Sequence, residues 1–172
     1  MASQRRARAA LGSFAFLLLA PGVVAGLIPW LLTGWEMREP LPGWAPLRVV
    51  GAMILGAGAI VLVHAFTRFV VEGLGTPAPV APTERLVVGG LYRYVRNPMY
   101  LAVAVTIVGQ GLVLGQLWLL PYAAGFLVIV AAFARWYEEP TLSRQFGPAY
   151  DQYRRAVPGW WPRRRPWDPR AR

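Results

Sequence analysis

Residues 89–100 read GGLYRYVRNPMY and lead directly into an apolar run that extends to residue 114. The paired glycines allow the backbone to turn sharply or to approach a ligand closely. The tyrosines offer flat faces with hydroxyl tips, and the arginines are permanent cations with forked donors. Asn97-Pro98 is a helix-start signal, with Asn97 as the N-cap and Pro98 at the first helical position. The stretch therefore predicts a polar binding pocket at the mouth of a membrane helix.

The composition is that of a membrane protein. A length of 172 residues predicts one domain, which we expect to be a single membrane domain over residues 1–172. Hydrophobic residues make up 56% and charged residues only 15%, which soluble proteins do not match. The net charge is +10, with arginines and no lysine. The arginines fall mainly at the ends of apolar runs and in the tail, so we expect anionic lipids as partners and no nucleic acid. The chain has no cysteine and one histidine, which predicts no disulfide and no metal site.

Four apolar runs predict transmembrane helices, at about residues 11–34, 47–71, 98–116 and 117–136. Pro21 is expected to kink the first of them. In the second, Gly51, Gly56 and Ala59 present small residues on which another helix can pack closely. The last two runs are joined by so short a link that they must form an antiparallel hairpin. The predicted fold class is an all-α polytopic membrane protein.

Several polar and aromatic residues in and between the runs have structural interpretations. Trp35 and Trp44, in the loop between the first two runs, suit an interfacial aromatic belt. Gln110, midway along the third run, is expected to hydrogen-bond to another helix. The spacing of residues 64, 68 and 72 puts a histidine, an arginine and a glutamate on one helical face, where an interfacial charge pair beside a packed histidine is the favoured interpretation.

The pattern changes after Glu138-Glu139-Pro140. Apolar residues recur every three or four positions, which predicts amphipathic cytoplasmic helices over about residues 138–157, with a break at Gly147-Pro148. The stripe consists of Leu142, Phe146, Tyr150, Tyr153 and Val157. Such helices lie in the membrane interface or form a lid over the bundle. The basic, tryptophan-rich tail 158–172 is expected to be flexible and bound to the membrane surface.

Two readings of Glu138 and Glu139 stay open at this point. Adjacent carboxylates at the end of a span must be solvated or paired. They either form a solvated helix end near Arg135 and Arg144, or one of them anchors a cationic or hydroxyl-bearing ligand beside the Tyr-Arg-Asn cluster.

The arginines also predict the orientation. If the N-terminus is cytoplasmic and four helices span the membrane, every arginine except Arg38 and Arg48 lies on the cytoplasmic side. The positive-inside rule favours this arrangement. Both termini, the 89–100 stretch and the Glu138-Glu139 pair are then cytoplasmic. In a prokaryote the membrane would be the plasma or inner membrane.

Two blocks of residues together resemble a known superfamily. The first is Gly90-x-Tyr92-x-x-x-Arg96-Asn97-Pro98-Met99-Tyr100, and the second is Glu138-Glu139-x-x-Leu142-x-x-x-Phe146-Gly147-x-x-Tyr150-x-x-Tyr153, ending in Val157-Pro158. Separated by a helical hairpin, they resemble the isoprenylcysteine carboxyl methyltransferase and phospholipid methyltransferase superfamily over about residues 75–162. The resemblance implies an integral-membrane methyltransferase that binds S-adenosyl-L-methionine on the cytoplasmic side and takes a lipophilic substrate from the bilayer.

The resemblance also implies a set of site residues. The cofactor-binding residues carried over by position are Glu84, Arg85, Leu86, Val87, Gly90, Tyr92, Asn97, Pro98, Met99, Tyr100 and Glu138. Catalytic roles are predicted for Arg96 and Arg135, which would place anionic groups, and for Glu139. The chain departs from the superfamily in having Asn97 where many members have histidine, so this residue cannot act as a general base. It also has Ala134 where the prenylcysteine enzymes place an arginine for the substrate carboxylate.

The expected function is therefore methyl transfer from S-adenosyl-L-methionine to a small lipophilic or membrane-associated acceptor. The acceptor group is a carboxylate, an amine, a thiol or a lipid head group. Two alternatives remain: an NADPH-dependent membrane oxidoreductase like the sterol reductases, and a membrane scaffold without catalytic activity.

Overall fold

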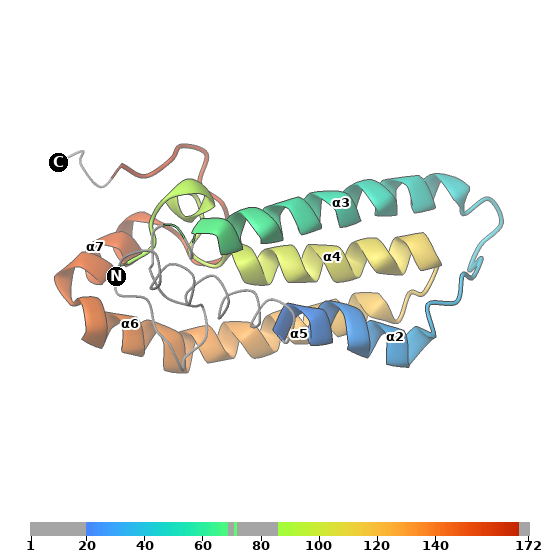
Figure 1. Cartoon of the computed structure of the whole chain (residues 1–172), viewed down its shortest axis with the longest axis horizontal. Coiled ribbons are helices and arrows are strands. Elements are labelled where there is room, and N and C mark those ends of the chain that lie inside the picture. Colours follow the sequence, from blue (N-terminus) through green and yellow to red (C-terminus); the bar gives the residue numbers. More distant parts are fainter. Residues whose placement is uncertain (1–19, 69–70, 72–85, 169–172) are drawn as a thin grey trace, which may run out of the picture. The chain divides into compact units, whose positions relative to one another are not determined.

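The structure is a computed structural model that describes residues 20–68, 71 and 86–168. In these residues all regular secondary structure is helical (Figure 1). The α-helices are α2 (Ile28–Thr33), α3 (Ala45–Arg68), α4 (Pro98–Leu114), α5 (Leu119–Phe133), α6 (Glu139–Phe146) and α7 (Pro148–Ala156). Two π turns, η1 (Val23–Leu27) and η4 (Ala134–Glu138), and one 3₁₀ turn, η3 (Gly90–Arg93), complete them.

Two of the helices have the length and composition of a membrane span. They are α3, with 24 residues and a mean hydropathy of 2.3, and the continuous helix Leu119–Phe146, with 28 residues and a mean hydropathy of 1.7. Ala20–Thr33 and Pro98–Leu114 are apolar but shorter. The all-helical prediction is confirmed for the described residues, and two of the four predicted spans are supported at full length. The part of the first predicted span before residue 20, and the expected charge pair with the glutamate at 72, lie outside the described residues.

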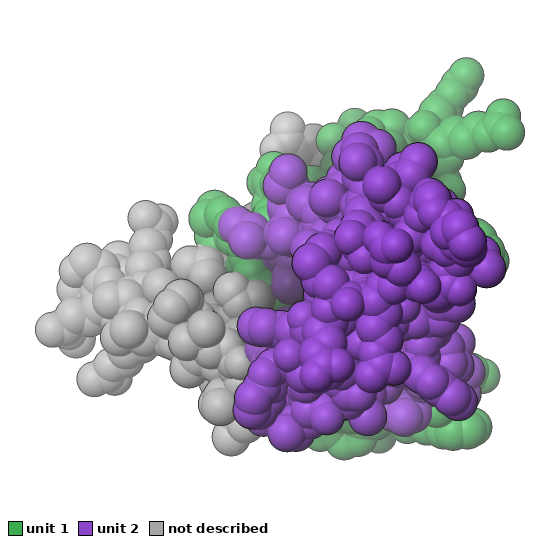
Figure 2. All heavy atoms as spheres, turned by 90° about the vertical axis from the view of Figure 1, so that its right-hand side faces the viewer, with its two compact units in different colours: residues 1–16, 64–98, 131–172 green, residues 17–63, 99–130 purple. Residues whose placement is uncertain are grey.

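The chain packs as two compact units, which Figure 2 distinguishes by colour. Unit 2 consists of residues 17–63 and 99–130, and unit 1 consists of residues 1–16, 64–98 and 131–172. Unit 2 therefore holds the middle parts of the apolar helices. Unit 1 holds residues 89–98 of the GGLYRYVRNPMY stretch together with the C-terminal region.

Close contact between α3 and α4 in unit 2 depends on glycines (Figure 1). A Cβ atom on Gly58 would lie 2.6 Å from Thr106 Oγ1, and one on Gly109 would lie 2.6 Å from the Leu55 backbone nitrogen. Gly51 is equally tight, since its Cβ would lie 2.7 Å from Leu112 Cβ. Small residues let helix backbones approach in a membrane, where the hydrophobic effect does not drive helices together.

The small-residue face of α3 differs in part from the predicted one. Gly51 belongs to the contact as expected, but a Cβ on Gly56 would meet nothing within 4 Å, and Ala59 is exposed. Gly58 takes their place. The correction reflects the rotation of the helix about its axis, which the partner helix decides and the α3 sequence alone does not.

In unit 2, hydrogen bonds join the helical segment before Pro29 to the α4–α5 hairpin, at a place where the segment's own backbone bonding is incomplete. Pro29 has no N–H to donate to the preceding turn. There, the carbonyl oxygens of Val24 and Ala25 accept hydrogen bonds from Tyr122 Oη (2.7 Å) and Gln110 Nε2 (2.6 Å). These bonds satisfy backbone groups that lipid cannot satisfy. The prediction that Gln110 bonds to another helix is confirmed.

The α4–α5 hairpin forms as predicted. Gly115 ends α4 with a φ of +68°, a left-handed conformation that favours glycine, and α5 begins four residues later. Behind the turn, α4 and α5 share a buried core of Val103, Ile107, Leu119 and Ala123.

The prediction of an interfacial role is wrong for Trp44. Its side chain is only 4% exposed, and its Nε1 donates to the Leu112 carbonyl oxygen at 2.8 Å. Trp35, which is 53% exposed, is free to take the belt position. A tryptophan carries both a large apolar ring and one N–H donor, so it suits an interface and a buried helix end equally well.

In unit 1, the helix after α5 does not end at Glu138-Glu139-Pro140 as the sequence suggested. The chain passes through the π turn η4 and continues as α6 to Phe146. Pro140 sits at the start of α6, and the Glu139 N–H donates to the Ala134 carbonyl oxygen five residues back. The wider i→i+5 turn provides room for a proline that a regular α-helix would not tolerate there.

The amphipathic stripe of the C-terminal region is confirmed. Tyr150, Tyr153 and Val157 form a buried cluster on which Leu142 and Phe146 pack. Gly147 separates α6 from α7, with φ +53° and ψ −132°, which is accessible almost only to glycine. The two short helices therefore fold against each other and present one apolar face.

Candidate functional site

The site loop, residues 86–97, packs on this apolar face within unit 1. Leu86 and Val88 lie against the Tyr150–Tyr153–Val157 cluster. Val87, Tyr92 and Val95 are each 5–6% exposed. Residues 90–98 of the first sequence block therefore lie against the second block.

Gly90 lets the loop pass close to the end of α3. It has a φ of +57°, and a Cβ atom there would lie 2.8 Å from both His64 Nε2 and Arg68 Nε. A side chain at this position would be strained and would displace both groups. His64 and Arg68 consequently lie beside the glycine turn.

Arg96 is the centre of a polar network that joins the loop to the C-terminal helices. Its Nη1 lies 2.7 Å from Glu139 Oε1 and 3.1 Å from Tyr150 Oη. Its Nε donates to the Val157 carbonyl oxygen at 3.0 Å. The Arg96 and Glu139 side chains are 14% and 11% exposed, and Arg154 Nη2 lies 3.1 Å from the second Glu139 oxygen. The buried carboxylate is thus neutralised by two guanidinium groups.

The tyrosines of α7 complete the network. Tyr153 Oη donates a 2.7 Å hydrogen bond to the Tyr92 carbonyl oxygen, and both residues are buried. Burial raises the pKa of Tyr153. Burial also raises the pKa of Tyr150, against the opposing effect of Arg96. Both hydroxyls therefore remain protonated throughout the physiological range, Tyr153 as a donor to the Tyr92 carbonyl oxygen and Tyr150 as an acceptor from Arg96.

A second segment, the C-terminal strap (residues 157–167), runs along the loop. The backbone N–H groups of Arg96 and Asn97 donate to the carbonyl oxygens of Pro158 (2.9 Å) and Gly159 (3.2 Å). Further on, the N–H groups of Arg163 and Trp167 donate to the Tyr94 and Arg93 carbonyl oxygens. The expectation of a flexible tail is wrong for these residues. Their bonds are made by the backbone, which leaves little trace in the sequence.

Most of the predicted site residues belong to unit 1. They are Leu86, Val87, Gly90, Tyr92, Arg96, Asn97, Pro98, Glu138 and Glu139. Glu138 is partly buried, and its charge is close enough to Tyr150 to contribute to the rise in that tyrosine's pKa. Glu139 is paired with Arg96 and Arg154, and Glu138 stays a predicted ligand group.

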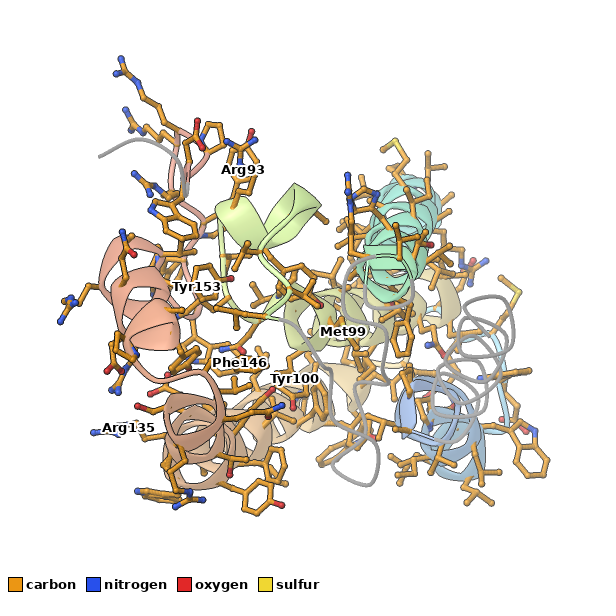
Figure 3. The ribbon with its side chains drawn as sticks, turned by 60° about the vertical axis from the view of Figure 1, so that its left-hand side comes forward. Arg93, Met99, Tyr100, Arg135, Phe146 and Tyr153 are labelled. Atoms are coloured by element: carbon orange, nitrogen blue, oxygen red, sulfur yellow. The ribbon has the colours of Figure 1, made fainter. Side chains whose placement is uncertain are left out.

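Five other predicted residues are placed differently or not described. Met99 and Tyr100, labelled in Figure 3, are partly buried in the first turn of α4 and belong to unit 2. Arg135 is exposed and points outward from the π turn η4 (Figure 3). Glu84 and Arg85 lie outside the described residues.

The sequence analysis missed the contributions of Arg93, Arg154 and Trp167. Arg93 Nε donates to the Trp167 carbonyl oxygen at 2.6 Å, and the Trp167 ring packs on Tyr153 with centroids 5.4 Å apart. The arginine-rich composition hid Arg93 and Arg154 among many candidates. Only the i, i+4 spacing of Tyr150 and Arg154 on α7 carried a usable signal.

One comparison with known proteins gave a match. A family model described as phospholipid methyltransferase matches residues 47–149, more than half of the chain. No curated protein and no solved structure matches it. The matched range contains the site loop and Glu139, and it ends before the C-terminal strap begins.

Proposed function

Because this chain belongs to the phospholipid methyltransferase family, a family of integral-membrane methyltransferases, we propose that it transfers a methyl group from S-adenosyl-L-methionine to a lipophilic acceptor at the cytoplasmic face of a membrane. One observation carries the proposal: the loop and the carboxylate pair on which the resemblance rests are held together by the Arg96–Glu139 ion pair.

The residues available around the loop fit the chemistry of the cofactor. Adenine and the methionine chain need apolar and aromatic walls, which Leu86, Val87 and Tyr92 provide; Val87 and Tyr92 are buried and Leu86 is partly buried. S-adenosyl-L-methionine supplies a methyl group on a cationic sulfonium, which nearby carboxylate or tyrosine oxygens favour. Glu138 and Tyr100 are the residues we assign to that part. Glu84, Arg85, Gly90, Asn97, Pro98 and Met99 complete the proposed contacts.

The roles of the charged residues follow from their partners. Arg96 and Glu139 are occupied with each other, with Tyr150 and with Arg154, so we assign them to holding the site in shape around the reacting groups. Arg135 is exposed and suits an anionic group of the acceptor. Asn97 can orient a ligand by hydrogen bonds but cannot accept a proton, so an amine acceptor would have to arrive unprotonated. In-line transfer then depends mostly on positioning and on exclusion of water.

We propose a topology of four spans with both termini in the cytoplasm. Ala20–Thr33 and α4 are apolar along their length, and a helix shorter than the bilayer is accommodated by local thinning of the lipid. Only Arg38 and Arg48 then lie on the opposite side, in agreement with the positive-inside rule. Anionic lipids are the expected neighbours of the arginine-rich face.

The family points to a lipid-like acceptor, and we propose a phospholipid head group ahead of a free carboxylate or thiol. Membranes that contain the protein are incubated with methyl-labelled S-adenosyl-L-methionine, and the lipid extract is analysed for label. Matched membranes that contain Glu138→Ala serve as the control. Label in the parent extract and its loss in the variant support the proposal. Calorimetry on the purified protein checks the cofactor: binding of NADPH in place of S-adenosylhomocysteine would overturn it.

A further inference from the structure

We propose that the C-terminal strap positions the site loop for the cofactor, with Trp167 and Arg93 as its positioning residues. This inference rests on the proposed function, because it assigns the strap to the same site. It goes beyond the family match, which ends at residue 149.

The strap contacts the loop over most of the loop's polar part. Four backbone hydrogen bonds join the two segments, and two guanidinium groups add one bond each, Arg93 Nε to the Trp167 carbonyl oxygen and Arg96 Nε to the Val157 carbonyl oxygen. The start of the strap meets the end of the loop, and the end of the strap meets Arg93. The strap therefore restrains the part of the loop from Arg93 to Asn97.

The bonds at the start of the strap fall on Asn97, which the cofactor is proposed to meet, and on its neighbour Arg96. The N–H groups of Arg96 and Asn97 are both taken by the strap, directly before Pro98 opens α4. Packing is close at this point, because a Cβ atom on Gly159 would lie 3.2 Å from Arg96 Nη2 and 3.5 Å from Asn97 Nδ2. Gly159 of the strap consequently lies close to the side chains of Arg96 and Asn97.

Trp167 anchors the far end. Its ring packs on Tyr153, and Tyr153 in turn donates to the Tyr92 carbonyl oxygen. The Tyr153 side chain thus connects Trp167 to Tyr92, which is 5% exposed. Figure 3 shows Arg93 and Tyr153 on the segments that this anchor joins.

The same strap provides a matched control. Trp161 is 82% exposed, whereas Trp167 is partly buried against the cluster of α7. Replacement of either tryptophan by alanine removes the same side chain from the same segment. Only Trp167→Ala should disturb the loop.

The test measures the loop and the cofactor separately in the full-length protein. Amide hydrogen exchange reports whether Arg96 and Asn97 keep their bonds to the strap. Calorimetry with S-adenosylhomocysteine and steady-state kinetics report the cofactor site. We expect Trp167→Ala and Arg93→Ala to speed exchange at both amides and to weaken binding about tenfold. The KM for the cofactor should rise while kcat at saturation changes less than about twofold. Trp167→Phe should restore most of the loss, and Trp161→Ala should have no effect.

The following outcomes would overturn the proposal. Unchanged exchange in Trp167→Ala would show that the strap does not hold the loop. Faster exchange with unchanged binding, or an equal loss in Trp161→Ala, would show that the strap does not serve the cofactor site. If the parent protein binds no S-adenosylhomocysteine, the proposed function fails, and the inference fails with it. The measurement on the parent protein therefore distinguishes this failure from a failure of the strap alone.

Discussion

Arg96 and Glu139 form an ion pair in which Nη1 lies 2.7 Å from Oε1, although they are 43 positions apart in the sequence. The pair is largely buried, and each partner makes further hydrogen bonds or ion pairs. Such a pair contributes little relative to a well-packed apolar pair, but removal of one partner leaves an uncompensated charge. Its main effect is to make the loop and the C-terminal helices depend on each other.

The first prediction concerns this dependence. Arg96→Met should destabilise the folded protein by about 3–5 kcal/mol, because Glu139 would then be buried without its closest partner. Arg96→Met combined with Glu139→Met should recover most of that loss. The free energy of unfolding in mixed micelles is the measurement. Arg154→Ala is the control, since its side chain is 40% exposed, and it should cost no more than about 1 kcal/mol.

The second prediction compares two glycines on α3. Gly58→Ala should destabilise unit 2 by about 1–3 kcal/mol, because its Cβ would lie too close to Thr106 and to the Ala102 carbonyl oxygen. Gly56→Ala should be neutral or slightly stabilising, since nothing lies within 4 Å of a Cβ there. Thermal unfolding of the two variants side by side measures the difference. Equal losses would contradict the described packing of α3 on α4.

The third prediction concerns the hydroxyl of Tyr153. Tyr153→Phe keeps the ring but removes the donor to the buried Tyr92 carbonyl oxygen, and it should cost about 1–3 kcal/mol. Tyr137→Phe serves as the control because Tyr137 is 49% exposed. The midpoint of thermal unfolding should fall in the first variant and stay within error in the second. A fall of the same size in both would mean that the hydroxyl bond does not matter.

The fourth prediction concerns alkaline pH. Burial raises the pKa of Tyr153 and Tyr150 above the ordinary value of 10.0. In the unfolded chain these hydroxyls lose their protons first, so their contribution to stability is complete below about pH 10 and is lost as the pH rises toward the folded-state pKa. Unfolding midpoints should therefore be flat from about pH 7 to 9 and decline above about 10. The decline should be shallower in Tyr153→Phe, and an identical slope would contradict the assignment.

The fifth prediction tests the cofactor residues. Glu138→Ala and Tyr100→Ala should each abolish S-adenosylhomocysteine binding by calorimetry while leaving membrane insertion intact. The reason is that each removes an oxygen proposed to face the sulfonium. Glu36→Ala is a suitable control, since the Glu36 side chain is 69% exposed and its ion pair with Arg38 is long, at 3.6 Å. Parent-like binding in both site variants would move the site elsewhere.

Features that repeat along one element could be predicted from the sequence. The stripe from Leu142 to Val157 followed from its three- and four-residue spacing, and the structure buries its tyrosines and Val157 as one cluster. The start of α4 at Pro98 followed from the Asn-Pro signal. Gly147 was a recognisable break for the same kind of local reason.

Features that depend on a partner could not be predicted. Gly56 and Gly58 look alike in sequence, and only the position of α4 distinguishes them. Pro140 indicated a helix end, but a π turn accommodates it. The resemblance placed Arg96 and Glu139 among the catalytic residues, whereas their mutual pairing became visible only when the two blocks were folded together.

The strap also has a consequence for the order of events during synthesis. Arg93 bonds to Trp167, 74 positions later, so this contact cannot form until almost all of the described chain has been made. The apolar helices are synthesised earlier, and they can enter the bilayer while the loop still lacks its last anchor. Ribosomes that stall before residue 167 would consequently leave inserted but poorly ordered protein, which proteases that survey the membrane can recognise and remove.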